Sequence, residues 1–69
     1  MLKFKRTSGG TYLATTLLNN TVVIEKHCEY NDWVMTVRDA DYNEVDGYFV
    51  IAPTKKTLVA MANNYNGEI

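Results

Sequence analysis

The chain has 69 residues with 46% hydrophobic and 22% charged side chains, a composition typical of one small globular domain. A single cysteine excludes an internal disulfide, and the single histidine excludes a Cys/His zinc framework. The formal net charge of −1 argues against a strongly basic nucleic-acid binder and against an acidic mimic of DNA.

Most of the chain has the pattern of short strands. Leu2 and Phe4 alternate with Lys3 and Lys5, and the same period of two recurs downstream, so each set lies on one face of a sheet. Gly-Gly, Asn-Asn and Asn-Asp pairs separate the segments as turn residues do. We predict strands over residues 2–6, 11–18, 21–29, 33–38 and 48–52.

The spacing of the apolar residues changes from the period of a strand to that of a helix after Pro53, which ends the fifth strand. Thr54 is a favourable N-cap, and the pattern predicts a helix over residues 54–65. Its apolar residues recur at i, i+3, i+4 and i+7, namely Leu58, Met61, Ala62 and Tyr65. The expected fold is α+β, a single domain over 1–69: a four- to five-stranded antiparallel meander with the C-terminal helix packed on one face.

The apolar positions predict which side chains form the core. The expected core comprises Phe4, Val22, Ile24, Trp33, Met35, Val37, Val50, Leu58, Met61 and Ala62.

The fifth strand, Tyr48–Ala52, is apolar at every position, whereas a half-exposed edge strand should alternate. The helix would cover only one of its two faces. The other face would be covered by closure of the sheet against the first strand, by the N-terminal hairpin, or by a second chain. We therefore expect a homodimer, or a target bound through this face beside the loop at 39–47.

His27 and Cys28 are adjacent, but neighbouring residues of a strand point to opposite faces, so they should not form a nucleophile–base pair. The 8–11 segment lacks the lysine and helix of a phosphate loop and is interpreted as a hairpin turn. No paired carboxylates have a spacing typical of acid–base catalysis. We assign no catalytic residue and no cofactor, and do not expect an enzyme.

The acidic loop over 39–46 resembles the start of a calcium loop. Glu44 and Val50 stand where that pattern needs a glycine and a final acidic residue, so the ligand set is incomplete. No metal ligand is assigned, and binding of a metal or small ligand by this loop is the third hypothesis for function.

Lys3, Lys5 and Arg6 form a small basic group that phosphates would attract. Lysines also protect the edge strand of a sheet without any ligand. A nucleic-acid-binding module using these three residues is the alternative function.

The basic N-terminal residues are not followed by the apolar stretch of a signal peptide. The longest apolar run is too short to cross a bilayer. We expect no membrane association and a cytoplasmic location, the host cytoplasm if the chain is phage-encoded.

The C-terminal half combines a Trp-bearing strand, an acidic loop ending in glycine, a short apolar strand and a Thr-capped, Lys-bearing helix. In this it resembles small uncharacterised phage and prophage proteins. The Thr57-Leu58-Val59-Ala60 run departs from their usual early Glu and Ala in the helix. The resemblance implies a protein that acts by binding a host protein, as anti-CRISPR and other anti-defence inhibitors do.

The leading functional hypothesis is therefore a small non-catalytic module that binds a host or cognate protein. The residues expected to contact that partner lie in the acidic loop and at the start of the fifth strand, namely Tyr42, Glu44, Asp46, Tyr48 and Phe49.

Overall fold

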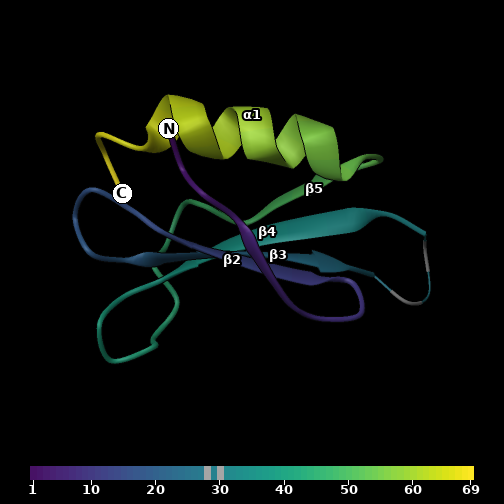
Figure 1. Ribbon diagram of the computed structural model, residues 1–69, viewed down its shortest axis with the longest axis horizontal. Helices are drawn as coiled ribbons and strands as arrows, with labels where there is room; N and C mark the ends of the chain where they lie inside the picture. The colour runs from purple at the N-terminus through teal and green to yellow at the C-terminus, as the bar shows by residue number, and fades with distance from the viewer. Residues whose placement is uncertain (28, 30) are drawn as a thin grey trace.

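The computed structural model describes residues 1–27, 29 and 31–69, and it has the predicted α+β fold (Figure 1). One antiparallel sheet has its strands in the order β1-β2-β3-β4-β5, and the helix α1 lies across one side of it. The elements are β1 (Lys5–Ser8), β2 (Thr11–Thr15), β3 (Thr21–Lys26), β4 (Trp33–Arg38), β5 (Val50–Ala52) and α1 (Lys55–Tyr65).

The core lies between the sheet and α1. Val22 pairs with Val37, and Ile24 pairs with Met35, in the register of β3 with β4. These four side chains are fully buried, and each stabilises the fold by about 1.5–3 kcal/mol relative to exposure. Leu58 and Ala62 of α1 are buried against them, and the other predicted core residues are half-buried around this cluster, namely Phe4, Trp33, Val50 and Met61.

The start of α1 follows from local hydrogen bonding. The Thr54 hydroxyl accepts a hydrogen bond from the backbone N–H of Thr57 at 3.3 Å, which satisfies one of the free donors of the first turn. The helical stripe then turns toward the sheet, as its spacing predicts.

The first strand begins later than predicted, at Lys5 rather than at residue 2. The backbone N–H of Leu2 donates to Asn63 Oδ1 of α1 at 2.8 Å, so the N-terminal residues run beside the helix instead of pairing with β2. Figure 1 shows this end of the chain next to α1. Leu2 is nevertheless buried and Lys3 exposed, so the predicted alternation holds.

The second strand ends at Thr15, three residues before the predicted boundary. The Thr16 hydroxyl accepts from the backbone N–H of Asn20 at 3.0 Å and donates to the main-chain oxygen of Ile69, so Thr16 belongs to a turn. Asn19 has a φ of 64° there, the conformation asparagine tolerates. Leu17, which was expected in the strand, is 77% exposed in this turn.

The third strand ends at Lys26, short of the predicted residue 29; Cys28 lies outside the described residues. The fifth strand is also shorter than predicted and begins at Val50. The chain already pairs with β4 through Glu44, opposite Arg38, and through the N–H of Val45, which donates to the carbonyl of Val37 at 2.8 Å. Residues 46–49 connect this contact to β5, and Tyr48 among them packs against the core.

Candidate functional site

The side of the sheet away from α1 has no second layer among the described residues (Figure 1). We call it the open face. The strand register places neighbouring side chains there in rows, with Lys5 next to Leu13, Leu13 next to Val23, and Val23 next to Thr36. The open face comprises Lys3, Lys5, Thr11, Leu13, Thr15, Thr21, Val23, Glu25, Val34, Thr36, Arg38, Glu44, Phe49 and Ile51.

The open face is apolar at its centre, where Val23 is buried, and at its β5 edge, where two side chains are exposed. Val23 is 5% exposed because Leu13 and Thr36 flank it on the neighbouring strands. Toward the β5 edge, Phe49 is 59% exposed and Ile51 is 55% exposed. The fifth strand thus divides as predicted, with Ala52 buried on the helix side and these two side chains in solvent.

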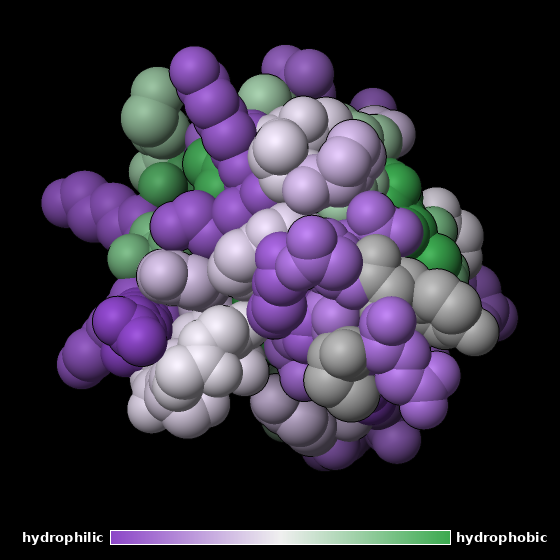
Figure 2. Space-filling view, turned by 90° about the vertical axis from the view of Figure 1, so that its right-hand side faces the viewer, coloured by the Kyte–Doolittle hydropathy of each residue, from purple (hydrophilic) through white to green (hydrophobic). Residues whose placement is uncertain are grey.

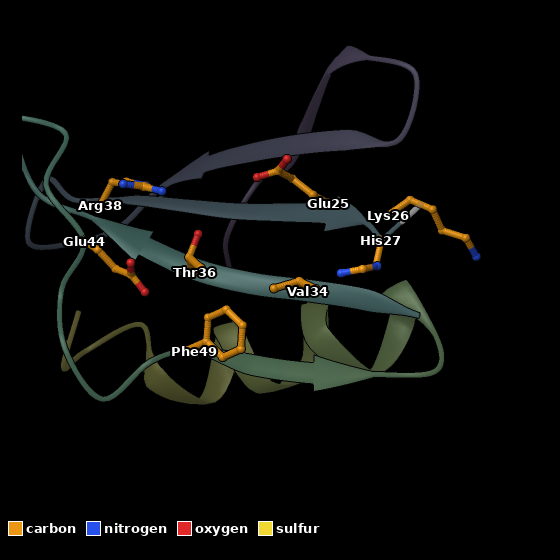
Figure 3. A pocket seen from close by; sticks show the side chains of 8 residues that line it. All are labelled: Glu25, Lys26, His27, Val34, Thr36, Arg38, Glu44 and Phe49. Carbon is orange, nitrogen blue, oxygen red and sulfur yellow. The ribbon is translucent and has the colours of Figure 1, made fainter. Parts of the chain in front are cut away.

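A hollow of about 340 Å³ lies on the open face beside Phe49. Figure 3 shows the Phe49 ring standing over its lower margin and the carboxylates of Glu25 and Glu44 at two other sides. The lining residues come from β3, β4 and the loop before β5, namely Glu25, Lys26, His27, Val34, Thr36, Arg38, Glu44 and Phe49. An apolar floor with polar groups of both signs around it suits a partner side chain.

The loop between β4 and β5 folds on itself through Asp39. The Asp39 Oδ1 atom accepts hydrogen bonds from the backbone N–H groups of Asp41 and Asn43, both at 2.9 Å. That oxygen, at the first position of the suggested calcium loop, therefore organises the turn. Across the described part of the chain, no three His, Cys, Asp or Glu side chains gather as metal ligands would.

Arg38 connects this loop to the sheet. Its guanidinium carbon lies 5.4 Å from the centre of the Tyr42 ring, a cation–π contact. Tyr42 is 57% exposed and has a φ of 64°, so the loop holds an aromatic ring out at its tip.

The structure brings together some of the predicted partner residues and separates one. Glu44 and Phe49 line the hollow, and Tyr42 and Asp46 are exposed on the adjoining loop. Tyr48 is the exception, because its half-buried ring packs edge-on against Tyr65 of α1 with centroids 5.6 Å apart. Period-two alternation from Phe49 is the sequence signal that places Tyr48 on the opposite side.

The basic group of the alternative hypothesis is split between the two faces. Lys3 and Lys5 line a second hollow on the open face, next to Leu13 and Thr15. Arg6 is opposite Tyr12 in the register, and Tyr12 packs against the core on the other face. These three cations therefore present no continuous stripe to a phosphate backbone.

Two other lysines lie over aromatic rings. Lys55 Nζ is 3.8 Å from the centre of the Tyr12 ring, and Lys26 Nζ is 5.1 Å from that of Trp33. Tyr12 and Trp33 are themselves in contact, with centroids 6.1 Å apart, at the end of the sheet where α1 begins. Hydrophilic side chains dominate the surface at that end, and the green hydrophobic ones lie at its margins (Figure 2).

His27 follows the end of β3 and lines the first hollow, where its Nδ1 atom accepts a hydrogen bond from the backbone N–H of Glu29 at 3.2 Å. Cys28 lies outside the described residues, so the expectation that the two side chains face apart stays a prediction.

Comparisons with protein family models, with curated proteins and with solved structures gave no match to this chain. Among the described residues, no helix reaches the length and hydrophobicity that a membrane crossing requires.

Proposed function

We propose that this chain is a non-catalytic protein-binding module whose binding surface is the open face together with the loop over residues 39–49. The observation that carries the proposal is the exposure of Phe49 and Ile51 beside a hollow with an apolar floor. Small monomers seldom leave a large apolar patch rimmed by polar groups in solvent unless a partner covers it.

The chemistry of the surface indicates what the partner presents. The hollow beside Phe49 suits an apolar side chain of the partner. At its margins the carboxylates of Glu25 and Glu44 can pair with a cation next to that side chain, and Arg38 and Lys26 can pair with an anion. The two carboxylates offset the charges of Lys26 and Arg38, so the hollow has no excess of cations for a phosphate backbone, which supports a protein partner over a nucleic acid.

The likeness of the C-terminal half to small phage and prophage proteins extends the proposal. It implies that the partner is a host protein in the host cytoplasm and that binding inhibits it, with a defence protein as the natural target. The capture experiment below identifies the partner, and an activity assay of that partner tests inhibition.

The decisive variant is Phe49→Asp, which places a charge on the exposed ring position without touching the core. Leu17→Asp is the matched control, because Leu17 is also apolar and even more exposed, at 77% against 59% for Phe49, but lies on the β2–β3 turn. Tagged chains would be incubated with host lysate and bound proteins identified by mass spectrometry. We expect Phe49→Asp to lose a protein that the parent and Leu17→Asp both retain, with all three melting within a few degrees of one another.

Two outcomes would contradict this function. One is capture of the same protein by Phe49→Asp and the parent. The other is binding of single-stranded or duplex oligonucleotides with an affinity that falls steeply with salt and depends on Lys3 and Lys5, which would favour the nucleic-acid alternative.

A further inference from the structure

The open face carries both halves of a complementary contact. One half, on β4 and β5, offers the hollow beside Phe49 with the carboxylate of Glu44 at its margin. The other half, on β1 and β2, offers the half-buried side chain of Leu13 with Lys3 and Lys5 beside it. The second half thus has the chemistry that the first one accepts, an apolar side chain next to a cation.

We infer that the open face binds a second copy of this chain, with the β2 strand of one copy lying over the β5 strand of the other. This inference rests on the proposed function, because it names a partner for the same surface and makes dimerisation compete with target binding. The interface would be isologous, so each contact occurs twice.

The charges decide how the two copies are oriented. A two-fold axis across the strands would place β1 over β1, with Lys5 facing its own copy. An axis along the strands and directly over β3 would place Glu25 opposite its own copy. Like charges in such positions oppose association.

An axis along the strands but between β3 and β4 avoids both repulsions. It sets β3 over β4 and β2 over β5 of the other copy. This axis keeps each residue at its own level along the strands. Leu13 therefore lies opposite the Phe49 ring of the second copy, and Thr15 lies opposite Glu44. Lys3 lines the same hollow as Thr15, so its long side chain can extend toward that carboxylate.

The size of the face sets the strength of the contact. Strands about 4.8 Å apart with a rise of about 3.3 Å per residue give the four overlapping strands a footprint of roughly 360 Å², since β1 has no strand opposite it. Both copies together would bury about 700 Å², below the roughly 1,000 Å² of a stable specific interface. The dimer should therefore be weak and concentration-dependent, which leaves the face accessible to a tighter-binding target.

A charge exchange tests the inference. Analytical ultracentrifugation at low salt would give dimer dissociation constants for the parent, Glu44→Lys, Lys3→Glu and the double variant. We expect each single variant to weaken the dimer at least fivefold, and the double variant to recover most of that loss because the pair is restored with its signs reversed. Glu68→Lys, the same charge change on an exposed position after α1 and outside the open face and the 39–49 loop, should leave the constant within twofold.

A second measurement reports the geometry directly. In a sample mixed from isotope-labelled and unlabelled chains, filtered NMR spectra should show contacts between the Leu13 methyl groups and the Phe49 ring of different copies. Failure of the double variant to recover, equal weakening by Glu68→Lys and Glu44→Lys, or a parent that stays monomeric at millimolar concentration would overturn the inference.

The experiments distinguish failure of the dimer from failure of the proposed binding function. A parent that is monomeric but captures a protein dependent on Phe49 would remove the dimer and leave the binding function. A parent that dimerises as described, but captures no protein in a Phe49-dependent manner, would remove the host-binding function and leave the dimer.

Discussion

The two faces of the sheet are built from adjacent residues of the same strands, yet they have opposite environments. Ile24 is fully buried under α1, while Val23, its neighbour in β3, is covered only by other side chains of the open face. On β5, Ala52 is buried and Ile51 is 55% exposed. Hydrophobic residues therefore occupy both faces, but among the described residues a helix covers only one of them.

This difference predicts that one face mainly stabilises the fold, whereas the other is available for the proposed binding. The covered face provides most of the buried apolar surface that a 69-residue chain needs to remain folded. Its side chains pack against α1. The exposed apolar residues of the open face, Phe49 and Ile51, add little to folding because solvent still reaches them. Substitutions on the two faces should therefore affect different measurements.

The largest expected effect is that of Ile24→Ala on the covered face. It removes a fully buried side chain and leaves a cavity under α1, so we expect a loss of about 2–5 kcal/mol in the free energy of unfolding. Chemical denaturation measures it. A loss below about 1 kcal/mol would mean that the helix does not seal this face.

An intermediate effect is expected from Thr54→Ala, which loosens the start of the helix that covers the core. Loss of the hydroxyl leaves the N–H of Thr57 without its capping oxygen and should cost about 1 kcal/mol. Thr54→Ser keeps the oxygen and should stay close to the parent in thermal melting. Equal losses in the two variants would assign the effect to the methyl group instead of the cap.

The smallest effect on stability is expected from Ile51→Ala, the same substitution as in the core but on the open face. Ile51 is more than half exposed, so its removal should change the free energy of unfolding by under about 1 kcal/mol. The same variant should weaken dimer or target binding. A large loss of stability would show that the open face is part of the core of the monomer.

The fold class was predictable because the chain carries clear periods of two and 3.6 with turn residues between them. The β4 boundaries and the Thr54 cap agree with local sequence patterns alone. Strand ends were less predictable where distant residues decide them. The position of Thr16 depends on a hydrogen bond to Ile69, more than fifty residues away, and no local pattern records it.

The candidate site was predictable only in part, for a similar reason. Glu44 and Phe49 were expected because they belong to one loop and one apolar run. Leu13, Val34 and Ile51 join them through the pairing of separate strands, which requires knowing the register. Alternation along β5 indicates the outward turn of Phe49, and it also separates Tyr48 from the site.

The strand order has a consequence for how quickly this chain folds. Every strand pairs only with strands adjacent in the sequence. The loop-closure entropy lost when each hairpin forms is therefore small. Two hydrogen bonds join distant segments, from Leu2 to Asn63 and from Thr16 to Ile69. They bring both ends of the chain to the end of the sheet where α1 finishes. Hairpins that form within microseconds would therefore precede a slower closing step in which these ends dock.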